Sequence, residues 1–247
     1  MRPFFENNVL QQQPFKPMII VVDTTKAGSA SNTFVLPIIK DTTETVKIYW
    51  GDGTNSTGVN GNNTHVYAAS GIYTIKIESR LFGGIYFNNL GDKAKITKIA
   101  NFGQGVSRLN ISSFYGCSSL LSIDIGNIVS NGTNAYAKFS GCTALTTVPL
   151  LNLSSVADAT GMFLGTSLTT VPLLNLSSCT NASNMFSGVT LTTQSYSDFL
   201  INLATLPLQS GVSFHGGNSK YNPAAAIARA YLIFNFGWTI TDGGAAP

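Results

Sequence analysis

The most evident shortage in this sequence is charge. Asp, Glu, Lys and Arg make up 10% of the 247 residues, whereas they make up about a quarter of an average soluble domain. Ser, Thr, Asn and Gly take their place, and this composition favours strands and turns with hydroxyls and amides at the surface. The net charge is only +3, and the basic residues do not gather around aromatic ones. We therefore expect no nucleic-acid partner.

Long apolar runs are also missing. No stretch of about 18 apolar residues occurs, so we expect no membrane span. Residues 1–14 contain one Arg but neither an apolar segment nor a small-residue cleavage site, so we expect no secretory signal.

A repeated segment organises the chain between residues 108 and 194. A phenylalanine followed by a glycine and a leucine recurs at intervals of 25, 24 and 23 residues, at Phe114, Phe139, Phe163 and Phe186. Val148–Ser155 returns unchanged as Val171–Ser178. A period of about 20–29 residues with recurring Leu and Val columns is typical of leucine-rich repeats stacked into a solenoid.

Each repeat has the same internal order of residue types. An Ala four residues before the Phe predicts a short helical stretch with both side chains on one face; these residues are Ala135, Ala159 and Ala182. A strand should follow, with three inward columns: Leu120/Leu145/Leu168, Ile123/Val148/Val171 and Ile125/Leu150/Leu173. Asn127, Asn152 and Asn175 form a further column, which predicts an amide ladder that satisfies backbone groups.

The repeat also explains the three cysteines. Cys117 and Cys142 share a column with Thr166 and Val189, and Cys179 falls in the column of Val156. A position that accepts Val or Thr favours a small buried side chain, so we predict free cysteines that fill the core. Metal ligation or a disulfide framework is the alternative.

Residues 18–97 are predicted to form a small antiparallel β-sandwich. Short β-branched runs occur at 18–22, 33–39, 46–50 and 71–77, and the third ends in the turn cluster Gly51–Thr54. Several short strands at this spacing, without a helical period, are typical of a sandwich.

Two motifs in this region resemble the PKD-type immunoglobulin-like family. They are Tyr49–Thr54, with its WGDG turn, and His65-Val66-Tyr67 followed by Gly71–Ile75. The resemblance implies an extracellular spacer or binding module rather than a catalyst. The segment Gly83–Asn89, which follows, departs from the usual end of the family pattern.

Asp52 could be a catalytic or calcium-binding carboxylate, but no second acid lies near it in sequence. We interpret it as a turn residue that accepts backbone N–H bonds between two glycines. Asp23 and Glu78 are the nearest conceivable partners. His65 is interpreted as a strand residue that packs or hydrogen-bonds near Trp50. No catalytic triad and no metal-ligand spacing is found, so no cofactor and no metal are expected.

Residues 1–17 are predicted to be an N-terminal arm, because three prolines interrupt them and no strand or helix period appears. Either the arm is a disordered tail or its apolar side chains dock on a partner or on the sandwich. The candidate docking residues are Phe4, Phe5, Val9, Leu10 and Phe15.

The domain pattern is therefore an arm (1–17), a PKD-like sandwich (18–97), leucine-rich repeats (98–194) and an α/β C-terminal cap (195–247), in a mainly β fold. The segment between the sandwich and the repeats is rich in lysine, at Lys93, Lys95 and Lys98. This predicts either a solvated first strand of the solenoid or a basic contact with an acidic partner or a glycan.

In the cap we predict helices over 195–205, with Asp198 in the first turn, and over 223–232. Strands are predicted over 211–215 and 236–241, and His215 is interpreted as structural.

The F-x-G-C-x-x-L signature and the Met-Phe pairs at Met162 and Met185 resemble BspA-like leucine-rich repeats. This class occurs in bacterial surface proteins and in some phage-encoded proteins, so the resemblance implies adhesion or a place in a virion. Between Arg108 and Asp198 only Asp124, Lys138 and Asp158 carry charge. Such a neutral, hydroxyl-rich surface suits glycan contact or tight packing rather than electrostatic steering.

Three functions remain open. The favoured one is a non-enzymatic phage virion protein, either a capsid decoration or a host- or glycan-binding adhesin. It would contact other virion proteins, or copies of itself, through the arm. The second is a bacterial cell-surface adhesion protein, which would need an export route. The third is a glycan-active enzyme, which would need two acids about 5–10 Å apart.

Overall fold

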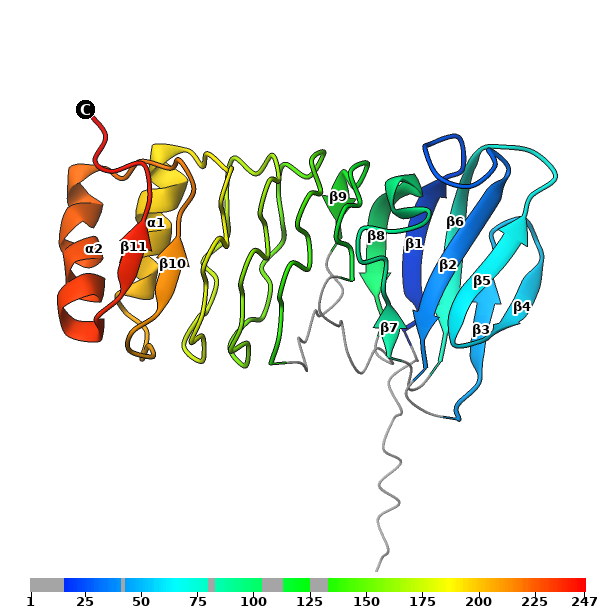
Figure 1. Ribbon diagram of the computed structural model, residues 1–247, viewed down its shortest axis with the longest axis horizontal. Coiled ribbons are helices and arrows are strands. Elements are labelled where there is room, and N and C mark those ends of the chain that lie inside the picture. Colours follow the sequence, from blue (N-terminus) through cyan, green and yellow to red (C-terminus); the bar gives the residue numbers. More distant parts are fainter. Residues whose placement is uncertain (1–15, 41–42, 80–82, 104–112, 125–132) are drawn as a thin grey trace, which may run out of the picture.

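The computed structural model describes residues 16–40, 43–79, 83–103, 113–124 and 133–247. The fold is mainly β with several sheets, as the composition predicts. The molecule is elongated: β-sheets form one end, two helices form the other, and a stack of coils lies between them (Figure 1). In the part of the chain described, no helix is long and apolar enough to cross a membrane.

The docking residues predicted in the N-terminal arm lie outside the described residues. These are Phe4, Phe5, Val9, Leu10 and Phe15.

Two sheets form the β-rich end. The larger has the strand order β4-β3-β6-β1-β8-β9 and the smaller the order β5-β2-β7. Alternate residues of β1 and β6 are buried between the layers, together with Phe34, Trp50 and Tyr67. In chain order the strands are β1 (Met18–Asp23), β2 (Thr33–Ile39), β3 (Val46–Tyr49), β4 (Asn55–Gly58), β5 (Gly61–Val66), β6 (Ile72–Glu78), β7 (Gly84–Ile85), β8 (Ile96–Phe102) and β9 (Ser122–Ile123).

Strand β8 links this sheet to the coils. It pairs antiparallel with β1, where Ile99 lies opposite Ile20, and parallel with β9, where Ile99 lies opposite Ile123. The larger sheet therefore continues into the first coil. The predicted boundary between residues 97 and 98 falls within β8.

The junction is fixed by a buried ion pair rather than by solvated lysines. Lys95 Nζ lies 3.8 Å from Asp92 Oδ2, and both side chains are almost fully buried. The ammonium also donates to the carbonyl oxygens of Ala30 and Thr33, and the carboxylate accepts from Ser29 N and Oγ. The predicted solvated strand is thus wrong for Lys95, which instead holds the β1–β2 loop against the segment that leads into β8.

The coils stack in register through both backbone and side chains. Phe114 N donates to Lys138 O at 3.0 Å, and Phe139 N donates to Met162 O at 2.9 Å. Phe163 N donates to Met185 O at 2.9 Å. The four repeated Phe rings stack with centroid separations of 5.9, 5.9 and 5.4 Å. The Phe column predicted from the repeat is therefore a continuous row in the core.

The short helices predicted before each Phe are wrong, because these segments are turns. Lys138 N donates to Ala135 O, three residues back, at 3.2 Å. The following backbone cannot continue as a helix, since Ala137, Gly161 and Asn184 have φ angles of 48°, 58° and 56°. These left-handed residues redirect the chain before the helix can form.

One predicted inward column is also wrong. Leu150 and Leu173 are 62% and 52% exposed, whereas the next residues, Leu151 and Leu174, are buried. The prolines that precede Leu150 and Leu173 have no N–H to donate to a ladder, so regular strand alternation does not continue through them. Ile125, the first member of this column, lies outside the described residues.

The predicted amide ladder is replaced by local turns. Asn152 Oδ1 accepts from Ser154 N and Oγ, and Asn175 Oδ1 accepts from Ser177 N and Oγ. Each amide therefore satisfies its own coil rather than the next one. Asn127 lies outside the described residues.

The predicted role of the cysteines as core residues is confirmed. All three are free and buried. Burial raises the pKa of Cys117 and Cys179 and raises the pKa of Cys142 to about 12. They are thus poor thiolates and poor metal ligands.

The helices and strands predicted at the C-terminal end are present, with shifted bounds. They are α1 (Thr193–Leu203), β10 (Ser213–His215), α2 (Pro223–Phe236) and β11 (Thr239–Thr241). Helix α2 continues four residues beyond its predicted end, to a left-handed cap at Gly237. The last strand therefore starts at Thr239 rather than at Phe236.

Candidate functional site

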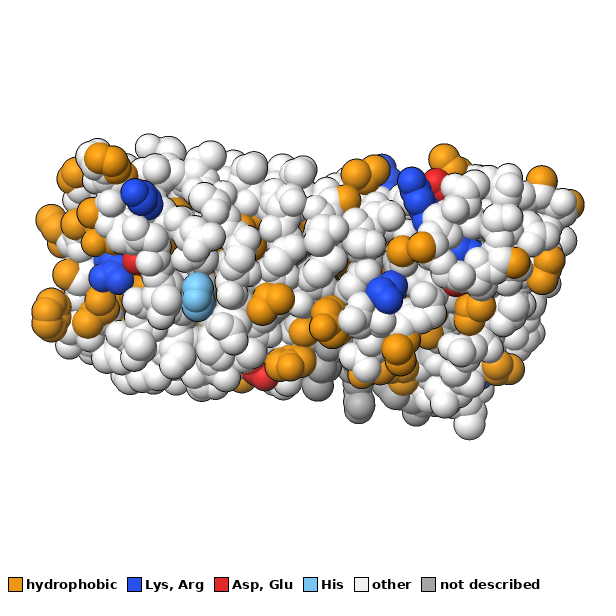
Figure 2. Space-filling model, turned by 45° about the horizontal axis from the view of Figure 1, so that its top comes forward, with side chains coloured by type: hydrophobic (Ala, Val, Ile, Leu, Met, Phe, Trp, Pro, Cys, Tyr) orange, Lys and Arg blue, Asp and Glu red, His pale blue; other side chains and the backbone are white. Residues whose placement is uncertain are grey.

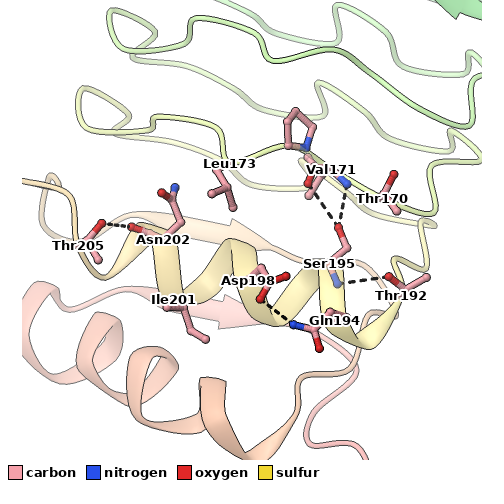
Figure 3. A pocket seen from close by; sticks show the side chains of 11 residues that line it. Thr170, Val171, Leu173, Thr192, Gln194, Ser195, Asp198, Ile201, Asn202 and Thr205 are labelled. Carbon is pink, nitrogen blue, oxygen red and sulfur yellow. Dashed lines mark hydrogen bonds between the residues drawn. The ribbon is translucent and has the colours of Figure 1, made fainter.

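The main candidate site is an open groove between the last coil and α1, with a volume of about 640 Å³. This is within the usual range for small-ligand sites. Figure 3 shows α1 along one side and the coil along the other. The residues that line it are Thr170, Val171, Pro172, Leu173, Thr192, Gln194, Ser195, Asp198, Ile201, Asn202 and Thr205.

Helix α1 is held beside the coil by two polar side chains. Ser195 Oγ accepts from Val171 N at 3.0 Å and donates to Val171 O at 3.4 Å. Two helical turns further along α1, Asn202 Nδ2 donates to Leu174 O at 3.4 Å. These bonds fix the width of the groove, because they tie the helix to the coil at two points.

The lining combines an apolar strip with hydrogen-bonding groups. Leu173 and Ile201 are partly exposed apolar side chains from opposite sides. Asp198 lies near them and accepts from Gln194 Nε2 at 2.8 Å. The arrangement can bind a neutral ligand that has one apolar face and several hydroxyl or amide groups.

Asp198 does not lie where it was predicted. Helix α1 begins at Thr193, and its N-cap Thr192 accepts from Ser195 N. The first turn therefore contains no acid, and Asp198 occupies the second turn. There its carboxylate faces the groove instead of capping the helix (Figure 3).

A second polar cluster lies at the WGDG turn of the β-sandwich. Asp52 Oδ1 accepts from Thr54 N and Oγ1, which confirms its predicted role in the turn. Its Oδ2 lies 2.8 Å from His65 Nε2, and the imidazole stacks on Trp50 at 4.7 Å. Burial opposes ionisation, but the bonds from Thr54 and His65 outweigh it and lower the pKa of Asp52 to about 2.

The Asp52–His65 pair was not predicted from the sequence, although the packing of His65 near Trp50 is confirmed. Asp23 and Glu78, considered as partners of Asp52, bond elsewhere: Asp23 accepts from Thr25, and Glu78 pairs with Lys76. Tyr67 closes the turn by donating to Trp50 O at 2.9 Å. The cluster thus stabilises the turn.

The acids of the coils do not come together. Asp124 pairs with Lys98 at 2.6 Å, and Asp158 Oδ1 accepts from Thr160 N at 2.9 Å. Asn134 and Asn181 make the same local bond in the neighbouring coils, so Asp158 occupies a turn position of the repeat. Among the described residues no three His, Cys, Asp or Glu side chains gather to hold a metal ion.

His215 takes part in a turn, where its Nδ1 accepts from Gly217 N at 3.0 Å. Its predicted structural position therefore agrees with the contacts that it makes.

Comparison with protein families, curated proteins and solved structures finds no match to this chain.

Proposed function

We propose that this chain is a non-enzymatic structural protein of a phage virion, a capsid decoration or an adhesin subunit, and that the groove beside α1 contacts a glycan. The observation that carries the proposal is this groove, which opens beside the stack of coils. The alternative is a bacterial cell-surface adhesion protein with the same groove.

The finer fold assignment belongs to this proposal. The stacked Phe rings and the backbone bonds between coils support a short BspA-like leucine-rich solenoid. The turn at Asp52, with His65 and Tyr67 packed around Trp50, supports a PKD-like sandwich in front of it. Both kinds of module offer a surface to which ligands or neighbouring proteins can bind. A sandwich followed by a solenoid therefore suits an exposed position.

The distribution of acids supports a non-catalytic role. Hydrolysis of a glycoside commonly requires two carboxyl groups about 5–10 Å apart on either side of the bond. Among the described residues that line the groove, Asp198 is the one acid. Asp124 and Asp158 are engaged with Lys98 and with a local turn.

The groove lining fits a neutral sugar better than a charged ligand. Leu173 and Ile201 can cover the C–H face of a sugar ring, and Asp198 and Gln194 can share hydrogen bonds with adjacent hydroxyls. A hydrogen bond to a charged group contributes about 1.5–3 kcal/mol. Loss of Asp198 should therefore weaken binding by tenfold or more.

A glycan array tests the groove. We expect the wild-type chain to bind a set of neutral glycans, and Asp198→Ala to lose that binding. Asp124→Ala, which removes an acid from another part of the stack, should bind as the wild type does. Absence of binding to any glycan, or an equal loss in both variants, would rule out the glycan contact.

Electron microscopy with gold-labelled antibody to this chain tests the location. Labelling of phage particles is the expected result. Labelling of bacterial envelopes without labelled particles would overturn the virion assignment in favour of the cell-surface alternative.

A further inference from the structure

Helix α2 forms the outer end of the stack, beyond α1 and the parallel pair β10-β11 (Figure 1). Asn222 caps it by accepting from Ala225 N, and Pro223 is its first residue. Ala225 and Leu232 are the residues of α2 that are buried. The helix is therefore attached along one narrow face.

The opposite face of α2 is apolar and exposed. Ile227 and Phe234 are 80% and 84% exposed, and Tyr231 beside them is 43% exposed. Pro223, Ile227, Ala230 and Phe234 follow the i, i+4, i+7, i+11 spacing of one helix face. Figure 2 shows hydrophobic side chains gathered over this end of the molecule.

This outer face carries no charge. Arg229 is the one charged residue of α2, and it turns away from the face to bond Asp242 Oδ2 at 2.8 Å and to lie over Tyr221. The charges of a charged partner would therefore have no opposite charge on this face to pair with. An uncharged apolar face is best covered by another uncharged apolar face.

The position of the face strengthens this argument. Stacked repeats need terminal caps whose outer surface is polar, because the end of the stack would otherwise associate. Here the terminal element presents Ile227 and Phe234 instead. The outer end therefore lacks the polar surface that keeps such stacks apart.

We propose that the α2 face packs against the α2 face of a second copy, in an antiparallel helix pair around a two-fold axis. A two-fold axis brings the same stripe of each copy together. Ala230 leaves a gap between Ile227 and Phe234, into which a large side chain of the other helix can fit. The result is an end-to-end dimer with the two sandwiches at its far ends.

The available area sets the strength of the dimer. An aromatic side chain has an area of about 150–250 Å². Phe234 is 84% exposed and Tyr231 is 43% exposed, so together they expose on the order of 250 Å². With Ile227 and the alanines, two copies bury at most roughly 800–1,000 Å² in total, which is below a standard interface and in the range of weak, transient ones. We therefore expect a weak dimer with a dissociation constant in the micromolar range.

Sedimentation velocity over a concentration series tests the proposal with the full chain. We expect a reversible monomer–dimer equilibrium, which Ile227→Glu and Phe234→Glu each weaken at least tenfold. Ile72→Glu is the matched control, since Ile72 is 71% exposed on β6 at the other end of the molecule. Because the two α2 positions are exposed, thermal unfolding of the variants should match that of the wild type.

Three results would overturn the proposal. The wild-type chain could remain monomeric up to millimolar concentration, which would leave the face to a different partner. The two α2 variants could dimerise as well as the wild type. Deletion of residues 1–15 could abolish the dimer, which would assign the contact to the N-terminal arm instead.

Discussion

The rings of Phe139 and Phe163 lie nearly parallel, with centroids 5.9 Å apart and 7° between their planes. Each ring is almost fully buried, and each belongs to a different coil. The contact therefore joins two coils, neither of which could form a stable core alone.

Phe163→Ala should lower the free energy of unfolding by about 3–5 kcal/mol, because it leaves a cavity with ring neighbours on both sides. Urea denaturation followed by circular dichroism measures the loss. Leu164→Ala is the control, since Leu164 is in the same turn but is 38% exposed. A loss within about 0.5 kcal/mol for Phe163→Ala would contradict the stacking.

The repeat spacing was sufficient to predict the buried columns of Phe, Cys and the first Leu. Equivalent positions of successive coils share one environment, and the Phe rings contact their equivalents directly. It could not predict the exposed Leu150 and Leu173. Their direction depends on how the chain continues after a proline, and no strand pairing fixes it.

The groove was not predictable for a different reason. Its two sides, around Leu173 and Asp198, come from separate elements, and the repeat pattern ends before α1. The buried position of Lys95 also depends on distant groups, since its ammonium donates to carbonyls more than 60 residues away. Sequence spacing carries no signal for such contacts.

A residue with left-handed backbone occurs at the same position of successive coils, and this predicts opposite effects on stability for two substitutions. Ala137 has a φ angle of 48°, where Gly161 stands in the next coil with 58°. An alanine in this conformation is strained by about 1–2 kcal/mol, while the greater freedom of glycine in the unfolded chain offsets part of this. Ala137→Gly should therefore stabilise the chain by about 0.5 kcal/mol.

Gly161→Ala should have the opposite effect and cost about 1 kcal/mol. An added Cβ would meet its nearest atom, Leu164 Cβ, at 3.9 Å, so the cost is conformational rather than steric. Thermal melts of both single variants measure the two effects. Changes of the same sign in both variants would refute the assignment of strain to this position.

The Asp52–His65 contact predicts that the free energy of unfolding depends on pH in the acidic range. The pKa of Asp52 is lowered to about 2, below its ordinary value of 3.8. The stabilisation is thus complete above about pH 4 and is lost as the pH falls towards 2. Asp52→Asn should lower stability by about 1 kcal/mol or less at pH 7, as expected for a partly exposed pair.

Urea denaturation at pH 2.5, 4 and 7 measures this effect. The difference between Asp52→Asn and the wild type should shrink at the lowest pH. Asp124→Asn is a control for loss of a surface carboxylate, because Asp124 pairs with Lys98 outside the turn. A difference that stays constant from pH 7 to pH 2.5 would show that ionisation of the Asp52 carboxylate does not stabilise the turn.

Lys138 occupies the coil position that Met162 and Met185 fill in the next two coils, and its side chain is buried. Burial lowers the pKa of its ammonium from 10.5 to about 8. The unfolded chain therefore binds more protons than the folded chain between about pH 8 and pH 10.5, and wild-type stability should rise with pH across this window. Below pH 8 the buried charge imposes its full cost.

Lys138→Met should consequently raise the free energy of unfolding at pH 7 by an amount on the order of 2–3 kcal/mol. The gain should become smaller at pH 10, where the wild-type lysine is largely neutral in the folded chain. Chemical denaturation at both pH values measures it, with Lys26→Met as a control at a half-exposed lysine. A destabilised variant, or a gain independent of pH, would mean that the Lys138 ammonium is well solvated in the folded protein.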